Sequence, residues 1–139
     1  MRAASARPVS LSKRVSQGVL GLLVLVLAYQ VYDRARLGMS GAPRAALKQL
    51  EACAEARELL GEPIDATWWG WSHGYLHVPR RSQAWSATSG RVDWSMPVAG
   101  SSGSGVLHFQ GEKVQGFWTL ESVLETDGAT VELRACAAP

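Results

Sequence analysis

Three histidines are the residues of this chain whose type best suits metal or haem chemistry. His73 and His77 lie four residues apart, and His108 stands alone further along. On a helix, residues four apart face the same way, which is a common spacing for zinc ligands. On a strand the same pair lies about 13 Å apart, at about 3.3 Å per residue, which is too far to share one ion.

The residues around His73 favour the strand. From position 69 to position 77 every second residue is aromatic or histidine, and the residues at positions 68, 70, 72, 74 and 76 alternate with them, as in strands. One face of this strand carries Trp69, Trp71, His73, Tyr75 and His77. If that face points to solvent, the five residues form an aromatic interaction patch for a partner or a membrane surface. If it points to the helix, they belong to the core, where we also expect Trp94 and Trp118.

Catalytic patterns are weak in this sequence. The Gly/Ser-rich turn at 100–105 lacks the strand-to-helix elbow of a serine nucleophile, and neither a lysine nor a helix follows it to hold phosphate. Glu121, Glu125 and Asp127 fall on the polar face of a strand and its turn, as a solvated surface would have them. No haem-attachment or paired-cysteine redox motif is present. We therefore expect that the protein is not an enzyme, and that it binds no cofactor, metal or small-molecule substrate.

Cys53 and Cys136 are the two cysteines of the chain. In an oxidising compartment they could form a disulfide. It would close a loop of about eighty residues and contribute about 2–4 kcal/mol. Alternation through the last strand places Cys136 on the face away from the helix, which disfavours the bond unless the strand ends earlier. A disulfide and two free thiols both remain open.

Residues 15–32 form an apolar run without a charged residue. As a helix the run is roughly 27 Å long, close to the roughly 30 Å of a hydrocarbon core. Tyr29 and Tyr32 suit the interfacial aromatic belt. Asp33 and Arg34 follow directly, without a clean signal-peptide cleavage site. We therefore predict an uncleaved transmembrane helix that contacts the lipid bilayer.

The charges beside this run predict its orientation. Four basic residues and no acidic residue precede it: Arg2, Arg7, Lys13 and Arg14. This bias favours a cytoplasmic N-terminus over residues 1–14, a single pass through an inner membrane and a periplasmic domain. The net charge of +2 and the position of these basic residues outside the domain argue against nucleic-acid binding.

The remaining chain predicts a linker over 33–42 and a domain over 43–139. Apolar residues recur at helical spacing from 43 to 61, where Gly61 and Pro63 end the pattern. Strand-like alternation then marks 92–98, 107–110, 118–125 and 130–135, with turns at 100–105, Gln115-Gly116 and Asp127-Gly128. Pro97 predicts an edge or a bend in its strand. Without crossover helices, the pattern predicts an α+β domain: one helix packed on one face of an antiparallel sheet.

Three segments of the domain together carry a family resemblance. The helix ends Leu59-Leu60-Gly61-Glu62-Pro63-Ile64, a strand ends Met96-Pro97-Val98-Ala99-Gly100 before Gly103 and Gly105, and Gly116-Phe117-Trp118-Thr119-Leu120 follows. This order resembles the cytochrome c oxidase assembly factor one family, which is similar to subunit twenty-one of the mitochondrial inner-membrane translocase. The resemblance covers the anchor and residues 42–133.

The resemblance implies an N-terminal transmembrane helix, a small α+β domain and a role in maturing a respiratory oxidase through contact with assembly intermediates. It carries no catalytic motif, so the matched residues are expected to determine the fold. We predict a bacterial, membrane-anchored, non-enzymatic interaction module with a membrane-protein partner. The alternative is a haem or metal carrier that uses the surface histidines.

Overall fold

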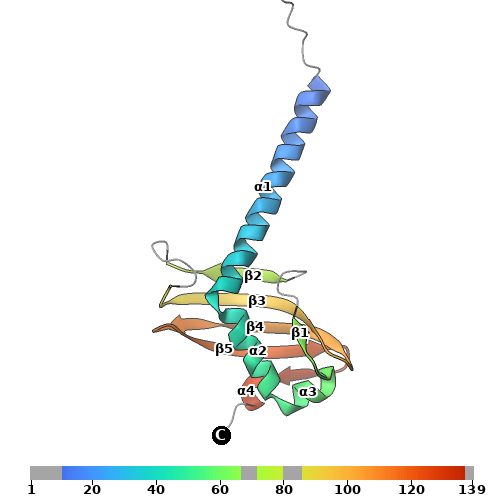
Figure 1. Ribbon diagram of the computed structural model, residues 1–139, viewed down its shortest axis with the longest axis vertical. Coiled ribbons are helices and arrows are strands. Elements are labelled where there is room, and N and C mark those ends of the chain that lie inside the picture. Colours follow the sequence, from blue (N-terminus) through green and yellow to red (C-terminus); the bar gives the residue numbers. More distant parts are fainter. Residues whose placement is uncertain (1–10, 67–71, 80–85, 137–139) are drawn as a thin grey trace, which may run out of the picture. The chain divides into compact units, whose positions relative to one another are not determined.

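The computed structural model describes residues 11–66, 72–79 and 86–136. The chain divides into two compact units, with the boundary between Tyr32 and Asp33. The first unit holds most of the long helix α1, and the second holds the end of α1, three short helices and a six-stranded sheet (Figure 1). The domain is α+β, as the alternating pattern predicted.

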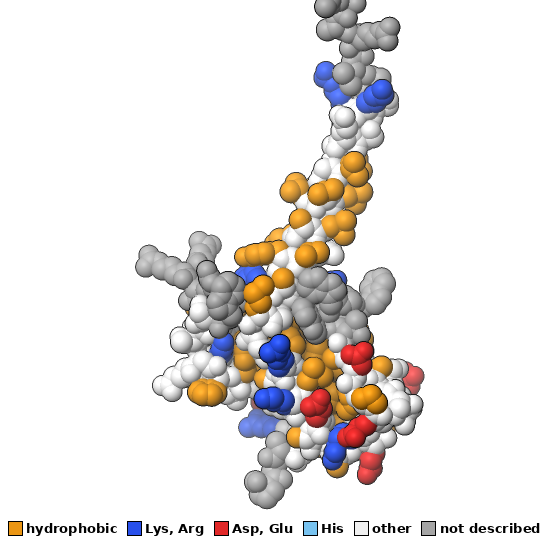
Figure 2. Space-filling model, viewed as in Figure 1, with side chains coloured by type: hydrophobic (Ala, Val, Ile, Leu, Met, Phe, Trp, Pro, Cys, Tyr) orange, Lys and Arg blue, Asp and Glu red, His pale blue; other side chains and the backbone are white. Residues whose placement is uncertain are grey.

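The first unit is an apolar helix. Helix α1 runs over Leu11–Ser40, and the side chains of its central valines and leucines are exposed. Figure 2 shows hydrophobic side chains along its middle and basic side chains at its N-terminal end. Among the described residues, one helix is long and apolar enough to cross a membrane, and it is this one.

The segment expected to be a linker is largely helical. Helix α1 continues through Gly38 to Ser40, and Gly41, with a φ of 80°, then separates it from α2 (Ala42–Ala52). Leu37 and Ser40 are buried within the second unit, and Trp118 Nε1 donates a hydrogen bond of 2.8 Å to Ser40 O. These contacts stabilise the last turns of α1, where the local sequence favours a flexible connection.

The single helix expected over 43–61 is two helices. Helix α2 ends at Ala52, α3 spans Ala54–Leu60, and Cys53 between them has an extended backbone with a ψ of 113°. Buried residues of both helices still follow one apolar face, so the predicted periodicity survives the break. The break falls at Cys53, which forms a disulfide with Cys136 near the C-terminal end of the domain.

The sheet is antiparallel throughout. Its strands are β1 (Asp65–Ala66), β2 (His73–His77), β3 (Gly90–Ala99), β4 (Ser104–Val114), β5 (Phe117–Thr126) and β6 (Thr130–Glu132). Strands β3, β4, β5 and β6 are neighbours in chain order. Strands β1 and β2 both pair with the edge of β3 that does not pair with β4 (Figure 1). The expected turns at 100–105, Gln115-Gly116 and Asp127-Gly128 connect these strands.

Two strand predictions are refined. Pro97 pairs with Val106 of β4, but on its other side it falls between the residues paired with β1 and those paired with β2. It therefore occupies a local gap in the sheet, where a missing N–H costs least. The last strand, expected to run to position 135, ends at Glu132, and a short helix α4 (Leu133–Cys136) follows.

One face of the sheet carries the core. Inward residues of β3, β4 and β5 meet the buried face of α2, which lies across the sheet, and α3 follows next to α4 (Figure 1). Trp94 is buried as predicted, and the half-buried Trp118 packs against the same cluster, with Lys113 Nζ 5.8 Å from its ring centre. Gln49 of α2 bonds Leu120 O and Ser122 Oγ, so the helix also satisfies polar groups of β5.

The end of α3 meets the turn between β3 and β4. Leu60 O accepts hydrogen bonds from the backbone N–H groups of Ser102 and Gly103, at 2.8 and 3.0 Å. A Cβ added to Gly100 would meet the carbonyl oxygens of Leu60 and Gly61. Segments that are forty residues apart in sequence thus touch through their backbones, and only glycine leaves room for this contact.

Replacing Gly61 with alanine is expected to lower the free energy of unfolding by about 1–3 kcal/mol. Gly61 has φ 75° and ψ 156°, a backbone conformation essentially confined to glycine, and an added Cβ would contact Ser101 and Ser102. The measurement is urea unfolding of the full-length protein in micelles, followed by tryptophan fluorescence. Gly128→Ala is the matched control, because a Cβ there meets nothing within 4 Å. Equal unfolding midpoints for both variants would contradict the prediction.

Candidate interaction surface

The sheet face opposite the helices is polar and carries no helix from the described part of the chain. We call it the outer face and define it by the outward residues of β2–β6 together with Arg134 of α4. Its principal side chains are His73, Tyr75, His77, Arg91, Asp93, Ser95, His108, Gln110, Glu112, Val114, Phe117, Thr119, Glu121, Val123, Glu125 and Glu132. The strict period of two in these strands separates them from the core.

Strand β2 places three of the five predicted patch residues on the outer face. His73, Tyr75 and His77 are exposed, whereas Leu76 between them is buried. Trp69 and Trp71 lie outside the described residues. From the sequence, this strand face could point either to solvent or to the core. The three described residues are exposed, so their face points to solvent.

Three ion pairs cross neighbouring elements on this face. Arg91 Nε lies 2.7 Å from Glu112 Oε1, and Arg134 Nη1 lies 2.7 Å from Glu121 Oε1. His108 Nε2 lies 3.3 Å from Glu125 Oε2, a pair that is ionic only when the histidine is protonated. All six side chains are substantially exposed, so each pair contributes about 0–1 kcal/mol. Their main effect is on the charge pattern that a partner would meet.

A serine, a histidine and a glutamate form a chain of contacts across β3, β4 and β5. Ser95 Oγ lies 2.6 Å from His108 Nδ1, and the other ring nitrogen faces Glu125. A hydrolase with such a set also needs free donors for the oxyanion. Ser95 lies in mid-strand between β2 and β4, where the backbone takes part in the sheet. We interpret the three residues as a cross-strand link on the outer face.

The histidines are spread over the outer face. His73 and His77 protrude from β2 at opposite ends of the strand, and His108 is separated from His73 by Ser95 of the intervening β3. Within residues 11–66, 72–79 and 86–136, no group of three or more His, Cys, Asp or Glu residues could hold a metal ion.

Two adjoining hollows mark the middle of the outer face. One has a volume of about 450 Å³ and lies toward β5 and β6, with His108, Glu121 and Arg134 in its lining. The other, of about 510 Å³, lies toward β2 and includes Tyr75 and Arg91. Asp93, Gln110 and Glu121 line both hollows. This shared lining makes the central rows of the sheet one continuous, shallow surface.

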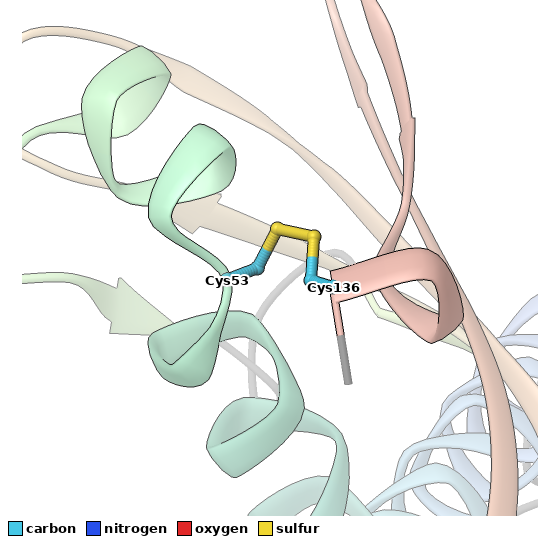
Figure 3. The surroundings of a disulfide bond; sticks show 2 residues. All are labelled: Cys53 and Cys136. Carbon is cyan, nitrogen blue, oxygen red and sulfur yellow. A yellow bond between two sulfur atoms is a disulfide. The ribbon is translucent and has the colours of Figure 1, made fainter. Parts of the chain in front are cut away.

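The two cysteines meet on the helix side of the domain. A disulfide joins Cys53, between α2 and α3, to Cys136 at the end of α4 (Figure 3). Their Cα atoms are 5.1 Å apart. The geometric objection from alternation does not apply, because β6 ends at Glu132 and α4 turns Cys136 toward the helices. Cys53 is fully buried in the core.

Sequence reasoning missed Asp93 and the Ser95–His108 contact. Both fall at outward positions of strands whose alternation was recognised, so their side of the sheet was predictable. Their neighbours were not, because cross-strand register depends on where each hairpin turns. The hairpin turns were expected approximately, whereas the register of β2 on β3 was not predicted at all.

The comparisons with known proteins identify one family. The model of the family described as cytochrome oxidase complex assembly protein 1 matches residues 15–135. The match begins in the apolar part of α1 and ends in α4, so it includes both the long apolar helix and the domain. No curated protein and no solved structure matches the chain.

Proposed function

The chain belongs to the cytochrome oxidase complex assembly protein 1 family, and from this premise we propose that it is a membrane-anchored factor that assists assembly of a cytochrome oxidase by binding a membrane-protein partner. The observation that carries the proposal is the extent of the match. It spans the apolar part of α1 and the described domain up to residue 135, so it relates the layout of the chain rather than one element.

The anchor supports action at a membrane. Helix α1 has exposed valine and leucine side chains around its middle, an arrangement suited to lipid and costly in water. Residues 15–32 would cross the bilayer once. An assembly factor held in this way needs only lateral diffusion to meet an oxidase subunit in the same membrane.

Two independent features support a cytoplasmic N-terminus and a periplasmic domain. Lys13 and Arg14, with Arg2 and Arg7, precede the span, which favours retention of this end in the cytoplasm. The disulfide between Cys53 and Cys136 suits a domain in an oxidising compartment. The membrane in this proposal is the inner membrane of a bacterium.

Binding, rather than catalysis, suits the outer face. It is broad and shallow, and its ion pairs are spread over the face instead of converging on one point. An enzyme site usually concentrates polar groups in a deeper, apolar pocket. A polar, open sheet face resembles the surface of a transient protein–protein interface.

Deleting this protein from its host is expected to lower the amount of assembled cytochrome oxidase and the oxidase activity several-fold. Apo-subunits or partial complexes should accumulate, because the assembly step that the protein assists becomes slow. The measurements are native-gel abundance of the oxidase and oxygen consumption with a reduced cytochrome or quinol donor. Succinate dehydrogenase activity in the same membranes is the internal control.

Complementation separates the anchor from the domain. The full-length chain should restore the oxidase, and a chain ending after Gly41 should not. Crosslinking of the tagged full-length protein in native membranes should recover oxidase subunits. Normal oxidase abundance in the deletion strain would refute the proposal. The visible absorption spectrum of the protein purified for crosslinking tests the haem-carrier alternative.

A further inference from the structure

The outer face has an acidic excess although the chain as a whole is basic. Its carboxylates are Asp93, Glu112, Glu121, Glu125 and Glu132, against the two guanidinium groups of Arg91 and Arg134. Both arginines are already bound to glutamates of the same face. The charge left over for a partner is therefore negative, in a protein whose net charge is +2.

Asp93 is the carboxylate best placed to receive a partner's cation. It is exposed, it lines both central hollows, and its side chain has no ion-pair or hydrogen-bond partner within the described part of the chain. Its cross-strand neighbours are the uncharged Tyr75 and Gln110. The nearest cation on its own strand, Arg91, is held by Glu112.

Tyr75 adds an aromatic surface beside this carboxylate. It lies directly opposite Asp93 in the register of β2 and β3, and 57% of its surface is exposed. Directly opposed residues of antiparallel strands have Cβ atoms about 4.5–5.5 Å apart. A guanidinium group can stack on a tyrosine ring while it forms two parallel hydrogen bonds to a carboxylate. The compact, strongly hydrated ammonium group of lysine matches this arrangement less well.

We propose that the outer face binds an arginine-bearing polypeptide segment, with Asp93 and Tyr75 as the receptor for one arginine side chain and Gln110 as a neutral donor and acceptor beside it. This inference deepens the proposed function, because it rests on a protein partner and names the chemistry of the segment that is bound. Val114 and the 80% exposed Phe117, further along the same face, offer apolar contact to the rest of the segment.

The test uses the full-length protein in nanodiscs of uncharged phosphatidylcholine and a fluorescein-labelled peptide of alternating arginine and leucine. Fluorescence anisotropy should report binding that weakens with salt. Asp93→Asn should raise the Kd about tenfold, equivalent to about 1.4 kcal/mol. Peptides with lysine in place of arginine should bind more weakly, and peptides with citrulline should lose most of the affinity.

Asp127→Asn is the matched control, since it removes one exposed carboxylate from the β5–β6 turn, away from Tyr75. It should leave the Kd within twofold of the wild-type value, and Tyr75→Leu should weaken binding while the protein keeps its unfolding midpoint. Absent binding, equal affinity for the citrulline peptide, or equal effects of Asp93→Asn and Asp127→Asn would overturn the inference. Asp93-dependent dimerisation of the protein, seen by light scattering, would overturn it in favour of a second copy.

The arginine receptor and the role in oxidase assembly can be refuted separately. If the deletion strain lacks oxidase and the Asp93→Asn chain restores it fully, the assembly role stands and the arginine receptor does not. If Asp93→Asn restores oxidase poorly although the variant is folded and inserted, the receptor acts in assembly. Peptide binding that depends on Asp93, in a protein whose deletion leaves oxidase unchanged, would support the receptor and refute the assembly role.

Discussion

Replacing Leu37 with alanine is expected to lower the free energy of unfolding of the domain by about 2–5 kcal/mol. Leu37 is completely buried, although it lies only five residues beyond Tyr32 on the long apolar helix α1. Truncating a buried leucine removes apolar contact and leaves a cavity that the surroundings fill only partly. The end of α1 is thus expected to behave as part of the domain core.

Met39→Ala is the matched control, because Met39 lies on the same turn of α1 but is 50% exposed. It should shift stability by less than about 0.5 kcal/mol, as is usual for surface sites. The measurement is urea unfolding of both full-length variants in the same micelles, with tryptophan fluorescence as the signal. Similar unfolding midpoints for Leu37→Ala and Met39→Ala would show that the end of α1 does not stabilise the domain.

Loss of the disulfide is expected to lower the free energy of unfolding by about 2–5 kcal/mol. The bond joins residues separated by 83 positions, so in the chain-entropy account its absence frees a large loop in the unfolded chain. The test variant is Cys53→Ala with Cys136→Ser. Alanine suits the fully buried position, and serine suits the partly exposed one.

The same bond tests where the domain lies. Protein taken from native membranes and alkylated at once under denaturing conditions should be modified at both cysteines only after reduction. The reductant should also lower the unfolding midpoint of the wild-type chain, while the double variant should not respond. Full alkylation without a reductant would mean that the cysteines are thiols in the cell, and the periplasmic placement would then rest on the N-terminal charges alone.

The family motifs acquire a physical reason in the fold. Leu60, Gly61 and the glycines at 100 and 103 were recognised only as an ordered pattern, and they were expected to determine the fold. They meet where the end of α3 hydrogen-bonds to the β3–β4 turn. A side chain at any of these three glycines would collide with atoms of the opposite segment.

The sequence by itself determined the features whose causes are local. An apolar run from 15 to 32 without charges predicts a membrane-spanning helix, because insertion depends on composition summed over one segment. Alternation in β3, β4 and β5 predicts strands with one buried face, because pleating alone sends successive side chains to opposite sides. The α+β class follows from the order of these patterns, and the family resemblance is likewise carried by residue order.

Only the tertiary structure decided the features that depend on distant partners. Helix α1 continues past Gly38 because Leu37 enters the core and Ser40 is bonded by Trp118, which is 78 positions away. The helix break at Cys53 coincides with a disulfide to a residue 83 positions away. Local propensity contributes tenths of a kcal/mol per residue, whereas such contacts contribute whole kcal/mol, so they override it.

The arrangement of the outer face has the same origin. Alternation predicted which residues share a strand face with Tyr75 and which share one with Asp93. The segment between the two strands has no regular sequence pattern that sets the register of their pairing. Their juxtaposition follows from the pairing of β2 with β3, in which Leu76 and Val92 are both buried and Tyr75 stands opposite Asp93. A shift of one residue would turn every side chain of β2 over, and burial of Leu76 in the core excludes it.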